Sequence, residues 1–242
     1  MKTLIASGAI LSIAALSPAL AAPEAAPIFN WTGFYIGGHL GGGWSDDSAK
    51  AALTGAGAFD PAVIANNASG IVGGGQIGYN WQFTSNWLLG IEGDLSGTNI
   101  HAFGTAPFAS GGIPYPPELH HEATRDINWL ASIRGRLGYT SNHWLVYVTG
   151  GGAWGSINYR TNITLVVPLT PQSFDTTSSG WVIGGGVEYA VTSNWTARVE
   201  YLHYDFGDTT VANVPAAAPN AALITTFNNK IDVVRAGVNY KF

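Results

Sequence analysis

The sequence predicts an all-β fold, an eight-stranded antiparallel up-and-down transmembrane β-barrel, and three observations support this prediction. First, only 10 % of the 242 residues are charged, yet no apolar run after residue 21 is long enough for a membrane-spanning helix. Second, eight stretches alternate apolar and polar residues with a period of two, as strands with two unlike faces do. Third, three short turns alternate with four long connections, a pattern typical of barrels that cross an outer membrane.

The N-terminus is predicted to be removed. Residues 1–21 have a positive start, an uncharged apolar stretch and a final Ala19-Leu20-Ala21, the three parts of a cleaved export signal. Residues 22–30 would then form a periplasmic lead-in, and residues 31–242 the barrel. An N-terminal anchor helix is the alternative, although the apolar stretch is short for one. The chain contains no cysteine, which excludes disulfides, thiolate metal sites and a lipid anchor at the cleavage site.

Eight alternating stretches are the predicted strands. In one of them, Ile71 and Ile77 share an apolar face, while Gln76 and Asn80 lie on the opposite, polar face. Because strand side chains point alternately to two faces, each stretch is expected to turn one face to lipid and one to the lumen. The facing of the fifth stretch near Trp144 stays open. The predicted strands cover residues 31–45, 71–83, 87–96, 127–139, 143–159, 180–191, 195–207 and 231–242.

The connections between these strands predict which end faces which side of the membrane. Three of them carry Thr-Ser-Asn, and Asn86, Asn142 and Asn194 are expected to tolerate the left-handed backbone that tight hairpins often need. Both chain ends fall on the side of these turns, which are therefore predicted to be periplasmic. The other connections are long and aperiodic, and they are predicted to be external loops. They cover residues 46–69, 100–125, 160–178 and 208–229.

Aromatic side chains are expected to mark the two membrane interfaces, where indole and phenol rings are favoured. Those predicted for the turn side are Trp31, Trp81, Phe83, Trp87, Tyr139, Trp144, Tyr189, Trp195 and Tyr240. Those predicted for the loop side are Trp44, Trp129, Trp154, Tyr159 and Trp181.

The inward faces hold as many acidic side chains as arginines. Buried charges are costly unless they are paired, so Glu92 and Asp94 are expected to pair with arginines on the next strand, and Glu188 with Arg198 in its own hairpin. An eight-stranded barrel is only wide enough for its side chains to fill, which predicts a paired polar core and no wide pore. A narrow or transient pore stays an alternative. The predicted network comprises Glu92, Asp94, Arg134, Arg136, Glu188, Arg198, Glu200 and Arg235. Mid-strand glycines are expected to relieve crowding where the small barrel curves sharply, or to leave room for these side chains.

Other motifs give weaker signals. The Gly-x-Gly-x-x-Gly pattern at residues 73–78 lies inside a predicted strand with no following helix, so it is interpreted as a chance match. His120 and His121 fall in the second predicted loop, either as part of a solvated loop tip or as a surface site for a metal or haem. No nucleophile motif or triad is visible, so no enzyme is expected. The net charge of −5 gives no support to nucleic-acid binding.

Five stretches carry a family resemblance: NWTGFYIGGHLGGGW at 30–44, GGGQIGYNWQ at 73–82, GRLGY at 135–139, VTGGGAWG at 148–155 and VRAGVNYKF at 234–242. Together they resemble the immunogenic outer-membrane proteins of alphaproteobacteria, a family of small opacity-protein-like, porin-family β-barrels. The final Tyr240 and Phe242 also resemble the C-terminal signal that the barrel-assembly machinery reads.

The resemblance implies a protein of the outer membrane of a Gram-negative bacterium, without a cofactor. The implied role is in envelope integrity and in contact with a host or the surroundings. The implied partners are outer-membrane lipids, lipopolysaccharide, the barrel-assembly machinery, and host or environmental ligands at the external loops. Two alternatives stay open, a narrow porin-like diffusion channel for small solutes and haem binding through a surface loop.

Overall fold

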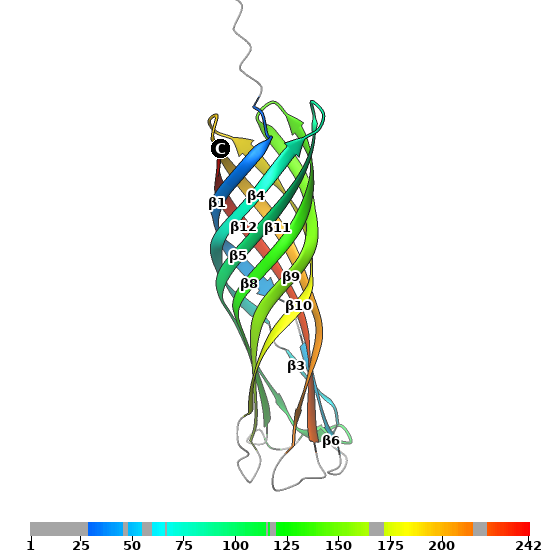
Figure 1. Ribbon diagram of the computed structural model, residues 1–242. Helices are drawn as coiled ribbons and strands as arrows, with labels where there is room; N and C mark the ends of the chain where they lie inside the picture. The colour runs from blue at the N-terminus through cyan, green and yellow to red at the C-terminus, as the bar shows by residue number, and fades with distance from the viewer. Residues whose placement is uncertain are drawn as a thin grey trace, which may run out of the picture.

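The computed structural model describes residues 29–45, 48–54, 60–65, 67–114, 116, 120–164, 172–214 and 222–242. The predicted export signal and most of the lead-in lie outside this range. No helix in the described part of the chain is long and apolar enough to span a membrane. Figure 1 shows a tall barrel of tilted strands, with the C-terminus at the end of the short turns.

Eight long strands form the wall, and each pairs antiparallel with its neighbour. β1 also pairs with β12, from Tyr35 opposite Lys241 to Trp44 opposite Asp232, and this pairing closes the ring. Closure leaves no free sheet edge in the membrane, where every backbone N–H and C=O must have a partner. The predicted fold class is confirmed. The strands are β1 (Gly33–Ser45), β4 (Ala68–Gln82), β5 (Trp87–Pro107), β8 (His120–Ser141), β9 (Trp144–Thr164), β10 (Gln172–Ala190), β11 (Trp195–Asn213) and β12 (Ala222–Lys241).

The wall continues far into the stretches that were predicted to be loops, so those predicted loops are too long. Beyond the ends of β1 and β4, a hairpin of β2 (Ser48–Thr54) and β3 (Ala62–Ala65) joins the sheet through pairing of β2 with β12. A small hairpin of β6 (Ala109–Ser110) and β7 (Ile113–Pro114) follows β5. We call the wall formed by β2, β3 and the outer ends of the six strands β5 and β8 to β12 the extension (Figure 1).

The two faces of the wall exchange polarity between the membrane part and the extension. In the membrane part, Ile91 and Ile133 point outward and are exposed, while charged side chains point inward. In the extension, Ile100 and Ile127 are buried inside, and His101 lies on the outer surface. This inversion follows from the surroundings, because hydrocarbon surrounds the first part and water the second.

Backbone bulges occur where the polarity changes. The register shifts between Gly97 and Ile100, between Ile127 and Trp129, and between Asp205 and Asp208. In β8 and β11 the extra residue moves the following side chains to the opposite face, whereas in β5 the even-numbered residues face inward on both sides of the shift. In β8 the bulge falls at Asn128, so Ile127 points inward although a strict alternation along residues 127–139 would place it on the same face as Trp129. A fixed alternation cannot follow such a change, which is why these strands resembled loops in the sequence.

Two aromatic side chains that were predicted to lie at the membrane interfaces lie inside the barrel instead. Trp31 is buried in the turn-side mouth, with its ring 4.7 Å from that of Phe29. Tyr159 is buried in the extension and donates a hydrogen bond to Asn229 Oδ1 at 2.8 Å. The facing of β9 is now settled, since Trp144 and the even-numbered residues after it point outward. Most of the other predicted interface aromatics are exposed, namely Trp44, Trp81, Phe83, Trp87, Tyr139, Trp144, Trp154, Trp181, Tyr189, Trp195 and Tyr240.

The three turn asparagines do not share one role. Asn142 has a φ of +54° and is the one non-glycine residue with a left-handed backbone in the described part of the chain. Asn86 instead clamps the next hairpin, because its Nδ2 donates to Thr140 O at 2.9 Å and its own carbonyl accepts from Thr140 N at 2.7 Å. Asn194 makes the same two bonds to Lys241, at 2.9 and 2.7 Å. The repeated motif therefore also joins neighbouring hairpins.

Gly186 is predicted to tolerate no larger residue. A Cβ at this position would lie 2.6 Å from Val199 O and 2.7 Å from the Tyr147 hydroxyl, which is packed in the lumen. We expect Gly186→Ala to lower the free energy of unfolding by about 1–3 kcal/mol, as overpacking of a dense core does. Gly93→Ala is the control, because its Cβ would meet only Ser132 O at 3.8 Å. The measurement is the urea midpoint of the folded band on unboiled gels, and equal midpoints for the two variants would contradict the prediction.

Candidate functional site

The eight charged side chains that were predicted to form a lumen network all lie inside the barrel and are buried. They come from the inward faces of five strands, β5, β8, β10, β11 and β12. The pleat brings them to one level of the lumen because neighbouring strands are paired in register, with Glu92 opposite Arg134 and Glu200 opposite Arg235.

Glu92 and Glu200 are the two centres of this lumen network. Glu92 accepts hydrogen bonds from Arg134 and Arg198, both at 2.5 Å, and from the Tyr35 hydroxyl at 2.7 Å. Glu200 accepts from Arg134 at 2.9 Å, and Arg235 Nη2 lies 2.7 Å from its Oε2. The Tyr147 hydroxyl also donates to Glu200, at 3.1 Å. Arg134 therefore joins both centres.

Asp94 and Glu188 extend the network toward the two ends of the barrel. Asp94 accepts from Arg235 at 2.9 Å and also from the Ser132 hydroxyl. Glu188 accepts from Arg136 at 2.8 Å, and also from Thr196 at 2.5 Å and Asn239 at 2.8 Å. Charged pairs with several hydrogen bonds offset the cost of leaving water, which isolated buried charges cannot do.

The geometry agrees with only part of the predicted pairing. Glu92 pairs with Arg134 on the neighbouring strand, as expected. Glu188 and Arg198 are opposite each other in the backbone register, but their side chains do not pair. Each binds a different residue across the lumen. Arg198 reaches Glu92, and Glu188 binds Arg136. Because the lumen is narrow, long arginine and glutamate side chains can reach across it. The ion-pair partner of a residue therefore need not be on the neighbouring strand.

Several neutral residues of the network were missed in the sequence. The Arg136 guanidinium stacks on the Tyr147 ring at 3.9 Å. His39 Nδ1 lies 2.6 Å from Gln76 Oε1, and its Nε2 lies 2.8 Å from Ser96 Oγ and 3.2 Å from Arg235 Nη1. Because Arg235 Nη1 and the Ser96 hydroxyl both donate to Nε2, this nitrogen carries no proton. The ring proton therefore lies on Nδ1, which donates to Gln76 Oε1, and His39 is neutral. These residues occupy inward positions of their strands, so the same period-two pattern could have identified them.

Two apolar layers enclose the lumen network. Toward the turns, Phe29, Trp31, Leu88 and Leu145 are buried together with Ala190. Toward the extension, a larger apolar cluster begins with residues such as Leu130, Leu202 and Val233 and continues through the outer ends of the strands. The lumen is thus stratified into an apolar layer, a charged layer and a second apolar layer.

His120 and His121 do not form the predicted loop site. Both lie in β8, where neighbouring side chains point to opposite faces of the wall. His121 points inward and is buried, and neither ring nitrogen has a hydrogen-bond partner. His120 points outward, with its Nε2 3.2 Å from Glu122 Oε1. The two imidazoles therefore cannot ligate one metal or haem iron together, and the described residues contain no group of three or more potential metal ligands.

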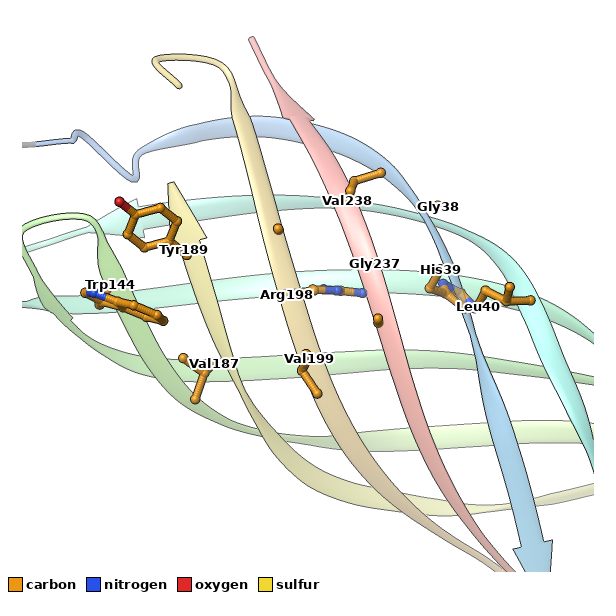
Figure 2. A pocket seen from close by; sticks show the side chains of 12 residues that line it. Gly38, His39, Leu40, Trp144, Val187, Tyr189, Arg198, Val199, Gly237 and Val238 are labelled. Carbon is orange, nitrogen blue, oxygen red and sulfur yellow. The ribbon is translucent and has the colours of Figure 1, made fainter. Parts of the chain in front are cut away.

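One hollow on the barrel is an open groove of about 800 Å³ on the outer wall (Figure 2). Leu40, Val199 and Val238 line it and are exposed on the lipid-facing surface. Arg198 and His39 are buried and belong to the lumen network behind the strands. The groove therefore presents an apolar surface to the membrane and lies apart from the polar chemistry.

Comparison with known proteins identifies one family, two relatives and one solved structure. The family of outer membrane protein beta-barrel domains matches residues 12–242. The 31 kDa outer-membrane immunogenic protein of Brucella melitensis is 35 % identical over 228 residues, covering 91 % of this chain and 88 % of that protein. The 22 kDa outer membrane protein of Rhizobium leguminosarum is 30 % identical over 184 residues, covering 74 % of this chain and 66 % of that protein. The solved structure of the outer membrane protease OmpT from Escherichia coli aligns with 90 % of this chain and 99 % of its own, at 10 % identity and a TM-score of 0.49.

Removal of Arg134 is expected to destabilise the barrel strongly. Arg134→Met leaves Glu92 and Glu200 buried with one fewer cation between them, and breaking a buried pair in this way costs about 3–5 kcal/mol. Arg160→Met removes an exposed arginine from the outer face of β9 and should change the stability by less than about 0.5 kcal/mol. Urea titration of both refolded variants tests this, and a wild-type midpoint for Arg134→Met would contradict the paired network.

Acid is expected to weaken the extension through His121. Burial lowers the pKa of His121 to about 4, so the folded extension disfavours the charged ring. Between pH 6.5 and pH 4 the unfolded segment binds a proton that the folded one does not, and local stability falls by about 1.4 kcal/mol per pH unit. Above about pH 6.5 the effect vanishes.

His121→Leu tests this effect, because leucine does not titrate. The measurement is the ratio of the proteinase K cleavage rate of wild type to that of the variant. We expect this ratio to be higher at pH 5 than at pH 7. Comparison at each pH cancels the pH dependence of the protease. A ratio that stays the same at both pH values would rule out His121 as the titrating group.

Proposed function

Because this chain belongs to the outer membrane protein beta-barrel domain family, we propose that it is a structural surface protein whose closed barrel supports the envelope and carries an extension for external contacts. Its relatives are outer-membrane immunogenic proteins of alphaproteobacteria, and it is a protein of the cell outer membrane. The observation that supports the proposal best is the stratified lumen. Transport would need a continuous polar path, whereas here two apolar layers enclose a network of mutually paired charges.

The proposed contribution to envelope integrity rests on rigidity. The lumen network ties the inward faces of strands on opposite sides of the ring, as in the bonds from Arg198 to Glu92 and from Arg136 to Glu188. Charged hydrogen bonds in a dry interior resist bending of the wall more strongly than exposed pairs would. Outside, the exposed aromatic residues of both interfaces would fix the height of the barrel among outer-membrane lipids and lipopolysaccharide.

The C-terminal strand supports the proposed recognition by the barrel-assembly machinery. Tyr240 and Phe242 share the outward face, with ring centroids 5.3 Å apart, and the Phe242 side chain is exposed. Phe242 N donates to Phe34 O at 3.0 Å, so the last residue also takes part in closing the ring. A C-terminal strand that the assembly machinery recognises before the ring closes would need exposed aromatic side chains for recognition. It would also need backbone groups that can pair with the first strand.

A catalytic role has little support in the geometry. Among the described residues, Ser96 and His39 bring a hydroxyl and an imidazole into contact, with His39 Nε2 2.8 Å from Ser96 Oγ. A general base must be free to take the proton, but Arg235 occupies the same nitrogen at 3.2 Å. Both residues are also buried between the apolar layers, where no substrate reaches them. We therefore propose that the protein is not an enzyme.

Planar-bilayer recording tests the closed barrel directly. Refolded protein, verified by its unboiled gel mobility, is expected to give no steady conductance at neutral pH, because two apolar clusters enclose the charged network in the lumen. A well-characterised porin inserted in the same lipid serves as the control for insertion. A stable, reproducible open level from this protein would favour the narrow diffusion channel and overturn the proposal.

A further inference from the structure

One seam of the extension is open between two neighbouring strands. The ladder between β10 and β11 runs from Ala190 opposite Thr196 to Trp181 opposite Asp205, and it ends there. β10 continues to Gln172 with β9 as its partner, and β11 continues to Asn213 with β12 as its partner. No ladder joins residues 172–180 to residues 206–213, all of which the structure describes. In Figure 1 the yellow β10 and the orange β11 diverge toward the loop end.

The sequence itself causes this separation. Gly207 has a φ of +70° and lies in the bulge of β11, which pairs Asp205 with Lys230 and Asp208 with Asn228. Gly207 N donates to Asp205 Oδ1 at 2.8 Å, a bond that fixes the turn of the backbone. A left-handed residue in a bulge bends its strand, here at the point where the pairing with β10 stops. The seam is therefore a built feature of β11.

The backbone at the seam has the properties of a template. In an antiparallel strand, alternate residues direct N–H and C=O groups to each side, so β10 and β11 each leave one row without a strand partner among the described residues. An extended peptide placed between them would pair on both of its edges. Edge pairing of this kind gives affinity through the main chain and selectivity through alternate side chains.

The side chains along the seam define the chemistry of such a peptide. Phe206 and Val211 face inward and are buried, and the partly buried Phe174 packs against the same apolar cluster. Asp175 and Asp208 lie on the outer surface and are exposed. Neither seam segment contains a lysine or an arginine. A complementary strand would therefore carry apolar side chains at one set of alternate positions and basic side chains at the other.

We propose that this seam binds an extended, basic peptide segment of an external protein, which adds as a strand between β10 and β11 with its apolar side chains inward. The proposal rests on the proposed surface-interaction role and gives it a site and a partner class. Binding would need no opening of the lumen, because the seam belongs to the extension and the lumen network lies below it.

A fluorescent ten-residue peptide of alternating valine and lysine, with blocked ends, is the probe for the first test. Its anisotropy is measured against the folded full-length protein in detergent. The matched control peptide is N-methylated at alternate residues, which removes backbone donors but keeps the charge and the side chains. We expect the N-methylated peptide to bind at least about ten-fold more weakly, and the double variant Asp175→Asn, Asp208→Asn to bind the unmodified peptide more weakly than wild type does.

Disulfide capture locates the binding site, since the chain has no cysteine of its own. A peptide with one terminal cysteine should be trapped by Thr177→Cys, on the seam strand β10, and not by Asn158→Cys, on the adjacent and fully paired β9. Equal trapping by the two variants, equal affinity of the two peptides, or no binding at millimolar peptide would overturn the proposal.

Light scattering of the detergent-solubilised protein tests for a different occupant. A dimer that disappears on addition of the peptide would identify a second copy of the chain as the natural occupant, and the proposal of an external partner would then be wrong. A monomer is the expected result. None of these outcomes changes the conductance of the barrel, so failure of this proposal is distinguishable from failure of the closed-barrel proposal.

Discussion

Mutual pairing of charges inside a narrow barrel is the interaction on which the rest of the structure depends. The membrane part buries four acidic side chains with four arginines, and Arg134 and Arg235 each contact three of the acids, Glu92, Asp94 and Glu200. Such charges are tolerated only when every one has close partners of opposite sign. The pleat, the register and the inward glycines bring these side chains to one level, where they occupy the lumen as one buried network.

The second constraint is that one continuous wall passes through two solvents. In hydrocarbon the outer face must be apolar and the lumen holds the polar groups, while in water the arrangement is the reverse. The chain resolves this conflict with bulges instead of separate domains. In β8 the extra residue Asn128 turns Ile127 into the apolar interior, whereas the partly buried Trp129 lies on the outer face. The same device at Gly207 bends β11 away from β10 and opens the seam.

Sequence reasoning could predict the features that depend on local pattern. Period-two alternation and the recurring Thr-Ser-Asn identified eight strands, their order and the lumen charges, because these depend only on which face each residue occupies. It could not predict side-chain partners such as Arg198 with Glu92, which span the lumen and depend on three-dimensional shape. It placed His120 and His121 in a loop because the alternation changes phase at a bulge, and no local signal in the sequence announces that change.

The most direct test of the stratified lumen is single-cysteine scanning along β8 in lipid nanodiscs with a water-soluble maleimide. The account predicts rapid labelling at Thr124 and Asp126, on the outer face of the extension, and little labelling at Ala123 and Ile127, in its apolar interior. It also predicts little labelling at Ser132, inside the charged layer, although this residue is polar and faces the lumen. Rapid labelling at Ser132 would show that water fills the barrel and would contradict the closed, paired interior.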